Sequence, residues 1–373
     1  MAKYVYISIG SNKGDRFQNL QLAVNRMFDL VGSIENISKV YTSPAFGFES
    51  EEFLNACLII KTELLPDKVM QYLLDIETEL GRTRTEGVGY EARVIDLDII
   101  FFEDEIINTQ LLQVPHPEMQ KRRFVILPLN DIASGIVHPV LKHTVRALLN
   151  NCDDTSELVA IDKHLENPIK TFNFSHRNFI AIEGNIGAGK TSLATKMSED
   201  FNAKLVLERF ADNPFLPKFY DDAMRYAFPL EMSFLADRYQ QISDDLSQLD
   251  LFKDFIVSDY DVFKSLIFSR ITLQEDEFKL YRKLFYIMYK EIAKPDLYIY
   301  LYQNTERLQQ NIKKRGRDYE QQIEDDYLNK INLGYLEFLK NQTELKVKII
   351  DISDMDFVAN RADYLNILKL ICS

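Results

Sequence analysis

A glycine-rich segment in the second half of the chain carries the clearest chemical signal. It lies between a strand-like apolar run and a predicted helix, and it matches the Walker A pattern: Gly184-Asn185-Ile186-Gly187-Ala188-Gly189-Lys190-Thr191. The glycines let backbone N–H groups surround phosphates, while Lys190 is placed to reach the outer phosphates and Thr191 to ligate Mg²⁺. The segment predicts a nucleoside triphosphate site and leaves ATPase, GTPase and small-molecule kinase open.

Other polar residues of this half narrow the choice. The sequence has no Asn-Lys-x-Asp base-reading motif, which disfavours a GTPase. Glu208 follows the second predicted strand and is a candidate general base. Arg315, Arg317 and Glu320 lie on a predicted loop suited to closing over a transferring phosphoryl group. For that run alone, a solvated charged turn is the alternative interpretation.

The first half of the chain holds a second candidate site, built without a P-loop. Asp96 and Asp98 alternate with apolar residues in a predicted strand, so both carboxylates lie on one face. Adjacent like charges repel unless a cation lies between them, which indicates Mg²⁺, and a polar outer strand face is the alternative. Basic residues on both sides favour a polyphosphate site, namely Arg82, Arg84, His116 and Arg122.

The elements expected to position this carboxylate pair alternate as strand, helix, strand, strand, helix, strand. Residues Pro66, Gly32 and Gly81 mark helix ends. Apolar spacing predicts strands at 4–9, 34–42, 53–65 and 94–102, and helices at 17–31 and 67–80. This order predicts an α+β ferredoxin-like sandwich over residues 1–160.

A different pattern follows a linker expected at residues 161–175. Strands then alternate with helices to the end of the sequence. Short apolar runs of the buried parallel-strand kind occur at 179–183, 204–207, 255–257, 297–302 and 347–350. Residues 176–373 are therefore expected to form an α/β P-loop domain with a doubly wound parallel sheet, the second of two domains.

Composition limits the partners and the compartment. The net charge of −13 over 373 residues argues against a nucleic acid polymer as ligand. No apolar run approaches the roughly 18 residues of a membrane span, and the N-terminus enters a strand pattern without a secretory signal. The three cysteines, Cys57, Cys152 and Cys372, are dispersed, which indicates neither disulfides nor a zinc site. A cytoplasmic location is expected.

Residues 1 to about 160 resemble the 6-hydroxymethyl-7,8-dihydropterin pyrophosphokinase family. The matching phrases are Ile9-Gly10-Ser11-Asn12, Ser43-Pro44, Phe53-Leu54-Asn55, Gly81-Arg82-Thr83-Arg84, Arg93 through Asp98, and Val114-Pro115-His116-Pro117. The resemblance implies transfer of a diphosphate from ATP to the hydroxymethyl group of 6-hydroxymethyl-7,8-dihydropterin, with release of AMP, in folate biosynthesis.

The same resemblance implies roles for the matching residues. Asp96 and Asp98 would hold two Mg²⁺ ions, and Arg82 and Arg93 would act on the phosphates. Tyr90, where a tryptophan is common, lies on a loop, 86–92, expected to close over ATP. The residues that would bind ATP are Glu77, Arg84, His116 and Arg122. The residues that would bind the pterin are Ser43, Pro44, Phe46, Phe53, Asn55 and Phe124.

Residues 176–373 resemble the deoxynucleoside kinase family through the P-loop, the Glu208-Arg209 pair and the phrases Asn213-Pro214-Phe215-Leu216 and Phe219-Tyr220. The closest branch is that of bacterial deoxyadenosine and deoxyguanosine kinases. The resemblance implies that Glu208 deprotonates the sugar 5′-hydroxyl and that Tyr220 and Glu320 hold the 3′-hydroxyl. It also makes Arg315 and Arg317 lid arginines, and Asp259 with Thr191 the ligands of one Mg²⁺.

This half departs from the family pattern at two positions. Glu231 replaces the base-reading glutamine that precedes a helical arginine, here Arg238, by seven residues. A carboxylate accepts hydrogen bonds and suits the exocyclic amine of adenine or cytosine, whereas donating requires a protonated Glu231. The base preference stays open, with a purine, and deoxyadenosine in particular, favoured. Tyr260 stands where the family has an arginine, and Arg209 is one candidate to compensate.

Two interpretations of the whole chain remain. In the first, both halves are catalytic and the chain is bifunctional. In the second, only the pterin half is catalytic and the P-loop half binds nucleotide as a regulatory module. The first is favoured because base, P-loop lysine, magnesium hydroxyl, lid arginines and sugar-binding acid are all present. The resemblance further implies a homodimer formed through the kinase half.

Overall fold

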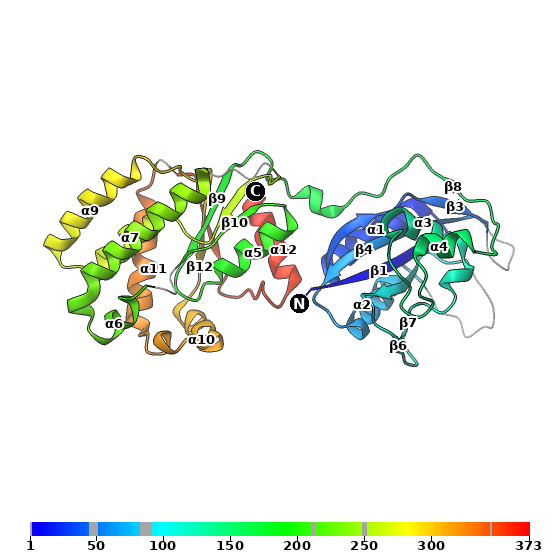
Figure 1. Ribbon diagram of the computed structural model, residues 1–373, viewed down its shortest axis with the longest axis horizontal. Coiled ribbons are helices and arrows are strands. Elements are labelled where there is room, and N and C mark those ends of the chain that lie inside the picture. The colour runs from blue at the N-terminus through cyan, green and yellow to red at the C-terminus, as the bar shows by residue number, and fades with distance from the viewer. Residues whose placement is uncertain (1, 45–50, 83–91, 210–212, 248–251, 344) are drawn as a thin grey trace. The chain divides into compact units, whose positions relative to one another are not determined.

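The chain folds into two compact units, Met1–Thr171 and Phe172–Ser373, in a computed structural model (Figure 1). The structure describes residues 2–373 except 45–50, 83–91, 210–212, 248–251 and 344. Each unit has its own sheet and its own buried apolar core. Among the described residues, no helix combines the length and apolar character needed to cross a membrane.

The first unit is an antiparallel sheet with helices packed against it. The strands that carry its candidate site lie in the order β5-β1-β4-β3-β8, and β2 also pairs with β4. The elements are β1 (Lys3–Ser11), α1 (Arg16–Leu30), β2 (Ser33–Ile37), β3 (Tyr41–Ser43), β4 (Phe53–Thr62), α2 (Pro66–Glu79), β5 (Asp96–Phe102), β6 (Ile107–Asn108), β7 (Gln113–Val114), α3 (Arg123–Ala133), α4 (Val145–Asn150) and β8 (Val159–Ala160), with short 3₁₀ turns at Met119–Lys121 and Pro168–Thr171.

Local signals set the limits of α1. The Asp15 carboxylate accepts from the Gln18 N–H at 3.0 Å and so caps the N-terminus. The helix buries the face predicted by its apolar spacing, including Leu20, Val24, Met27 and Phe28. Gly32 follows, where a Cβ would lie 2.1 Å from the Lys61 carbonyl oxygen of β4. Only glycine allows this approach of helix end to sheet edge.

The strand predicted at 34–42 is wrong in one respect, because it forms two strands, β2 and β3. The Lys39 N–H leaves the ladder and donates to the Asp131 carboxylate at 3.3 Å, and the Tyr41 hydroxyl donates to the same oxygen at 2.9 Å. Ser38 uses its hydroxyl to accept from the Cys57 N–H at 2.9 Å. A side-chain acceptor from a distant helix therefore interrupts the pairing, and local apolar spacing carries no sign of it.

The second unit is built on a parallel sheet, as predicted, with strand order β10-β11-β9-β12-β13. The chain adds strands on one side of β9 and then on the other, which places a switch point at the carboxyl end of β9. Its elements are β9 (Phe179–Gly184), α5 (Lys190–Asp200), β10 (Lys204–Val206), α6 (Leu216–Asp221), α7 (Ala223–Ser247), β11 (Ile256–Ser258), α8 (Phe263–Thr272), α9 (Glu275–Tyr289), β12 (Leu297–Tyr302), α10 (Thr305–Arg315), α11 (Asp325–Lys340), β13 (Val347–Asp351) and α12 (Arg361–Cys372), with a 3₁₀ turn at Asp318–Glu320.

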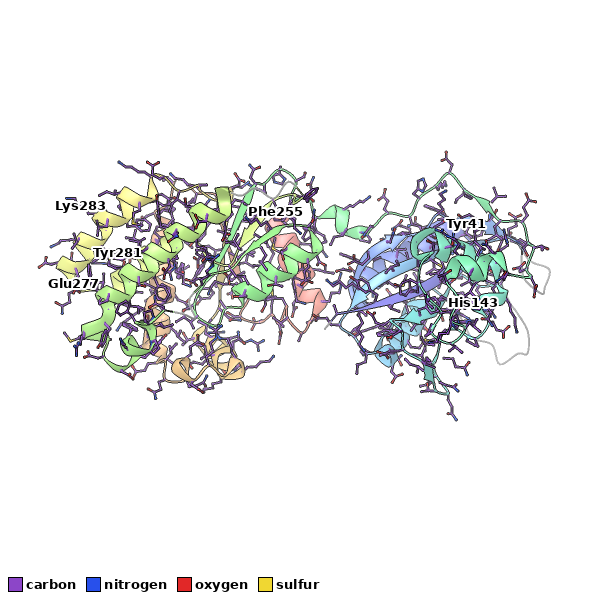
Figure 2. All side chains as sticks on the ribbon, viewed as in Figure 1. Tyr41, His143, Phe255, Glu277, Tyr281 and Lys283 are labelled. Atoms are coloured by element: carbon purple, nitrogen blue, oxygen red, sulfur yellow. The ribbon has the colours of Figure 1, made fainter. Side chains whose placement is uncertain are left out.

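Helices α7, α8 and α11 contribute side chains to a cavity in this unit, and α9 packs against α7 and α8. Helix α9 is amphipathic, with Tyr281 fully buried and Lys283 exposed (Figure 2). Tyr300 of β12 stacks on Tyr335 of α11, with 4.7 Å between ring centroids. All three tyrosines belong to the buried apolar core of this unit, where burying a large side chain contributes about 1.5–3 kcal/mol.

Candidate active sites

The P-loop joins β9 to α5 at the switch point. Gly187 and Gly189 have φ angles of +84° and +81°, which favour glycine, and a Cβ at Gly184 would lie 2.8 Å from the Leu301 carbonyl oxygen. The Lys190 ammonium donates to the Asn185 carbonyl at 2.9 Å. Burial, reinforced by the nearby Lys264, lowers the pKa of Lys190 to about 8. The loop therefore has the backbone shape that phosphate binding needs.

Thr191 and Asp259 meet beside the P-loop. The Thr191 hydroxyl donates to Asp259 Oδ2 at 2.5 Å, and Asp259 Oδ1 accepts from the Glu208 N–H at 2.8 Å. One carboxylate therefore ties the start of α5 to the ends of β10 and β11. A hydroxyl and a carboxylate are oxygen ligands of the kind that Mg²⁺ takes together with water and substrate phosphates. The pair fits the magnesium site expected there.

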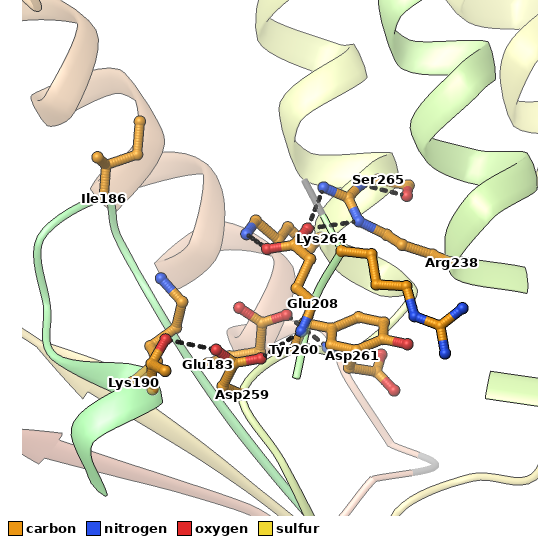
Figure 3. A network of polar contacts seen from close by, with 12 residues as sticks. Glu183, Ile186, Lys190, Glu208, Arg238, Asp259, Tyr260, Asp261, Lys264 and Ser265 are labelled. Atoms are coloured by element: carbon orange, nitrogen blue, oxygen red, sulfur yellow. Dashed lines mark hydrogen bonds and ion pairs between the residues drawn. The ribbon is translucent and has the colours of Figure 1, made fainter. Parts of the chain in front are cut away.

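Glu208 is buried between two cations (Figure 3). Arg238 of α7 donates from Nε and Nη2 to Glu208 Oε1 at 2.8 and 2.6 Å, and Lys264 of α8 donates to Oε2 at 2.6 Å. The Arg238 Nη1 donates to the Ser265 hydroxyl at 2.6 Å. Burial opposes ionisation, but Lys264 and Arg238 outweigh it and hold the pKa of Glu208 far below its usual range.

Lys264 is the functional residue that the sequence analysis missed. Tyr260 is fully buried in the apolar core, and its hydroxyl has no hydrogen-bond partner among the described residues. Its position cannot supply the charge expected from an arginine, whereas Lys264 supplies a cation directly to Glu208. The Arg209 side chain is exposed. Lys264 is only 9% exposed, which is unusual for a lysine. Burial cannot be read from a single sequence, so the sequence offered no signal for this residue.

The lid and the sugar-binding residues line the same cavity as Glu208. This cavity is open to solvent and has a volume of about 880 Å³. Glu320 is buried and accepts from Arg315 and, at 3.2 Å, from Arg317. Gly316, with φ +70°, ends α10 between the two arginines. Of the sequence-predicted residues, the cavity lining brings together Lys190, Thr191, Glu208, Tyr220, Glu231, Arg238, Asp259, Arg315, Arg317 and Glu320.

A buried carboxylate at the end of β9 was also missed. Glu183 is fully buried and accepts from the Tyr335 hydroxyl at 2.9 Å and from the Asp261 N–H at 2.7 Å. Burial raises the pKa of Glu183, although Lys264 and Lys190 lower it. Glu183 therefore holds the segment after β11 against the P-loop strand. It precedes the Walker A pattern by one residue, and no motif distinguishes it from a strand residue.

The Asp96 and Asp98 pair lies at the start of β5, on the face predicted by alternation. Asp96 accepts from Arg82 at 2.7 Å and from Arg93 at 2.8 Å. Burial, followed by the neighbouring Asp96 carboxylate, raises the pKa of Asp98 to about 7. Glu77 of α2 is buried, contacts Arg82 and accepts from the Leu97 N–H at 2.9 Å. The arrangement combines carboxylates for Mg²⁺ with arginines for phosphates, as the residue types predicted.

His116 lies close to this pair in the structure. Its backbone N–H donates to the Ile100 carbonyl at 3.1 Å, and its Nδ1 accepts from the Glu118 N–H at 3.2 Å. Burial and then the Arg122 charge lower the pKa of His116 to about 4. The imidazole is therefore neutral at pH 7, with Nδ1 as acceptor and Nε2 left as the donor.

The described residues expected to bind the pterin lie on or next to β3 and β4, two neighbouring inner strands of the first sheet, and on α3. The Asn55 amide is buried and donates to the Ser43 hydroxyl at 2.9 Å. Phe53 begins β4, and Phe124 lies in the first turn of α3, the helix that packs on β4. Pro44 is exposed at the end of β3. The expected residues Phe46, Arg84 and Tyr90 lie outside the described residues.

Comparison with known protein families matches each unit to a separate family. Residues 180–373 match the family described as deoxynucleoside kinase, and residues 6–134 match 7,8-dihydro-6-hydroxymethylpterin-pyrophosphokinase. The chain belongs to both families. It therefore carries a pyrophosphokinase domain followed by a deoxynucleoside kinase domain.

Two relatives that are similar in sequence agree with this division. Deoxyguanosine kinase of Bacillus subtilis is 37% identical over 190 residues, which is 50% of this chain and 92% of the relative. The 2-amino-4-hydroxy-6-hydroxymethyldihydropteridine pyrophosphokinase of Aquifex aeolicus is 40% identical over 143 residues, 38% of this chain and 88% of the relative. A solved deoxyadenosine kinase from M. mycoides with bound dATP is 24% identical, with a TM-score of 0.46, covering 52% of this chain and 100% of that one.

Metal binding in both domains depends on more than protein ligands. Among the described residues, no group of three or more His, Cys, Asp or Glu side chains is placed to hold a metal ion. Mg²⁺ ordinarily takes one or two carboxylates and completes its shell with water and substrate phosphates. Both sites therefore fit an ion that arrives with the nucleotide.

Replacing Lys264 by Met in the kinase domain is expected to lower kcat for deoxynucleoside phosphorylation by about 10- to 100-fold. This factor corresponds to the free energy of one hydrogen bond between charged groups, here the bond from Lys264 to Glu208. Arg209→Ala is the matched comparison, because Arg209 is the alternative suggested by sequence, and it is expected to change kcat by less than about threefold. Steady-state rates at saturating ATP measure both. A larger loss for Arg209→Ala than for Lys264→Met would show that Arg209 supplies the missing charge.

Proposed function

We propose that the pyrophosphokinase domain transfers a diphosphate from ATP to 6-hydroxymethyl-7,8-dihydropterin, and that the deoxynucleoside kinase domain phosphorylates the 5′-hydroxyl of a purine deoxynucleoside. The observation that carries the kinase part is the cavity in which the P-loop lysine, the ionised Glu208 and the lid arginines converge. The observation that carries the pterin part is the Asp96 and Asp98 pair bordered by Arg82 and Arg93.

In the kinase domain, Glu208 orients the attacking hydroxyl. Its low pKa makes it a weak proton acceptor while both cations contact it. Phosphoryl transfer through a loose transition state needs little proton removal before the P–O bond breaks, so alignment of the hydroxyl is the larger contribution. Lys190, Arg315 and Arg317 stabilise the charge on the transferring group, and Glu320 and Tyr220 position the sugar. Thr191 and Asp259 would hold one Mg²⁺, which would supply positive charge next to the phosphates.

In the pyrophosphokinase domain, the residues act by positioning and by neutralising charge. Asp96 and Asp98 would hold two Mg²⁺ ions, which would supply positive charge for the ATP phosphates. Arg82 and Arg93, held by Asp96, are oriented toward the same point. His116 is neutral and offers an Nε2–H donor to ATP. A neutral donor adds no further positive charge next to Arg122. The antiparallel strand order of this unit supports its assignment as a ferredoxin-like sandwich.

Further parts of the proposal concern assembly and location. All three cysteines are free, which supports a reducing cytoplasm. Exposed apolar residues of α9, Leu280 and Ile287, support a homodimer formed through the kinase domain. The alternative, in which the P-loop domain only regulates, is not favoured, because Glu208 and its two cations form a complete charged site.

Lys190→Met is expected to lower deoxynucleoside kinase activity by about 10²–10³-fold, because it removes the cation that reaches the outer phosphates. Pterin pyrophosphokinase activity of the same chain is expected to be unchanged, which controls for protein concentration, and urea unfolding checks the folding of the kinase domain itself. The measurement is ATP consumption with each deoxynucleoside in turn and then with the pterin. Absence of turnover with every deoxynucleoside in the unsubstituted chain would refute the kinase part of the proposal.

A further inference from the structure

Glu231 holds an unpaired carboxylate oxygen at the wall of the kinase cavity. The residue lies on α7 and is 3% exposed, and it is one of the residues that line the cavity. Its Oε1 accepts from the Thr272 hydroxyl of α8 at 2.9 Å. Its Oε2 is buried and has no hydrogen-bond partner among the described residues. A buried polar atom without a partner costs free energy, which indicates that a ligand completes it.

Cations near Glu231 do not pair with it. Arg238, on the same helix, and Lys264, on α8, lower its pKa through charge alone, since both donate to Glu208. The Tyr281 hydroxyl of α9 donates to the backbone carbonyl of Glu231 at 3.3 Å, and Tyr327 of α11 lines the same cavity. Burial outweighs these charges and raises the pKa of Glu231 to about 7. Its two protonation states are therefore both accessible near neutral pH.

The two purines differ in what they offer to such a group. Guanine presents two adjacent donors, N1–H and an N2–H, while adenine presents one donor, N6–H, beside the N1 acceptor. An ionised carboxylate only accepts, so its two oxygens match the guanine pair and oppose the lone pair of adenine N1. Oε1 keeps a second lone pair after accepting from Thr272. A protonated carboxyl both donates and accepts, and it therefore matches either purine.

We propose that Glu231 is a specificity-determining residue of the kinase site, which selects guanine when ionised and tolerates both purines when protonated. This inference rests on the proposed deoxynucleoside kinase function and narrows its substrate from a purine to deoxyguanosine in the ionised state. It differs from the adenine preference favoured by the sequence because the structure leaves two acceptor positions on this cavity-lining residue, the unpaired Oε2 and the second lone pair of Oε1.

Deoxyinosine isolates the contact, because it keeps the N1–H and O6 of deoxyguanosine and lacks only the 2-amino group. In the full chain, the ratio of kcat/KM for deoxyguanosine over deoxyinosine is expected to rise by about 10- to 100-fold between pH 6 and pH 8.5, the value of a hydrogen bond to a charged group. The ratio of kcat/KM for deoxyguanosine over deoxyadenosine is expected to rise over the same pH range. Ratios cancel pH effects on ATP, Mg²⁺ and the rest of the site.

Glu231→Gln supplies the matched variant. Its amide donates to O6 and accepts from N1–H, groups that deoxyguanosine and deoxyinosine share. The ratio of kcat/KM for deoxyguanosine over deoxyinosine is therefore expected to stay near one and independent of pH, and a urea unfolding transition like that of the unsubstituted chain checks that the kinase domain is folded. A flat ratio in the unsubstituted chain, or a pH-dependent ratio that persists in Glu231→Gln, would overturn the inference. Turnover of pyrimidine deoxynucleosides alone would overturn it but keep the kinase, whereas no turnover of any deoxynucleoside would overturn both.

Discussion

Glu208→Gln is expected to lower kcat for deoxynucleoside phosphorylation by about 10²-fold, the cost of misplacing a reacting group. The amide has the same size but presents an NH₂ group to one of the two cations that contact Glu208. It also offers the attacking hydroxyl one acceptor oxygen in place of two, so the hydroxyl is aligned less well. The measurement is the single-turnover rate with saturating ATP and deoxynucleoside. A rate within about threefold of the unsubstituted chain would remove Glu208 from the mechanism.

The same substitution is expected to destabilise the kinase domain by about 3–5 kcal/mol, because Arg238 and Lys264 are left buried without their counter-charge. A double variant, Glu208→Gln with Lys264→Met, is the control, since it removes one of the two stranded cations. It is expected to regain much of the stability but none of the activity. Urea unfolding of both variants separates the loss of charge balance from the loss of catalysis. If the double variant recovered activity, the role of Glu208 would be structural alone.

Asp98→Asn is expected to lower pterin pyrophosphokinase activity by about 10²–10³-fold, because it removes a carboxylate from the proposed magnesium and phosphate site. It is also expected to stabilise the pyrophosphokinase domain at pH 8. The pKa of Asp98 is about 7 in the folded chain and near 4 when unfolded. Stability from this group is therefore complete below about pH 4 and is lost as the pH rises through 7.

Urea unfolding at pH 5 and pH 8 in the presence of a chelator measures the stability part. The gain of Asp98→Asn over the unsubstituted chain should be larger at pH 8, where Asp98 is ionised. Asp104→Asn is the matched control, because Asp104 is an exposed carboxylate two residues beyond the end of β5. It should change neither activity nor the pH dependence. An equal gain at both pH values would contradict the raised pKa of Asp98, which burial and then the Asp96 carboxylate cause.

Local patterns predicted much of the scaffold. The P-loop and the Asp96 and Asp98 strand could be located from sequence because glycine spacing and period-two alternation are properties of neighbouring residues. The parallel sheet followed from short apolar runs between helices, since such strands are buried on both faces. Helix α1 and its buried face were predicted because the 3.6-residue spacing of apolar residues can be read from neighbouring positions alone.

Contacts between distant residues could not be predicted in the same way. Lys264 reaches Glu208 from 56 residues along the chain. Asp131 interrupts β2 and β3 from 92 residues away. In both cases the partner is chosen by the packing of a helix on a sheet, and nothing adjacent in sequence marks it. Glu231 was found by its residue type, but its unpaired oxygen and raised pKa depend on α8 and α9.

The positions of Tyr260 and Lys264 also bear on how related chains are judged. A residue-by-residue check against the family pattern would count the missing arginine as a sign of decay and class this domain as an inactive descendant. In the folded chain, Lys264 in the first turn of α8 supplies a positive charge next to Glu208. Selection acts on a charge at a point in space, and more than one position along a chain reaches that point. A lost motif residue is therefore weak grounds for inferring a lost activity.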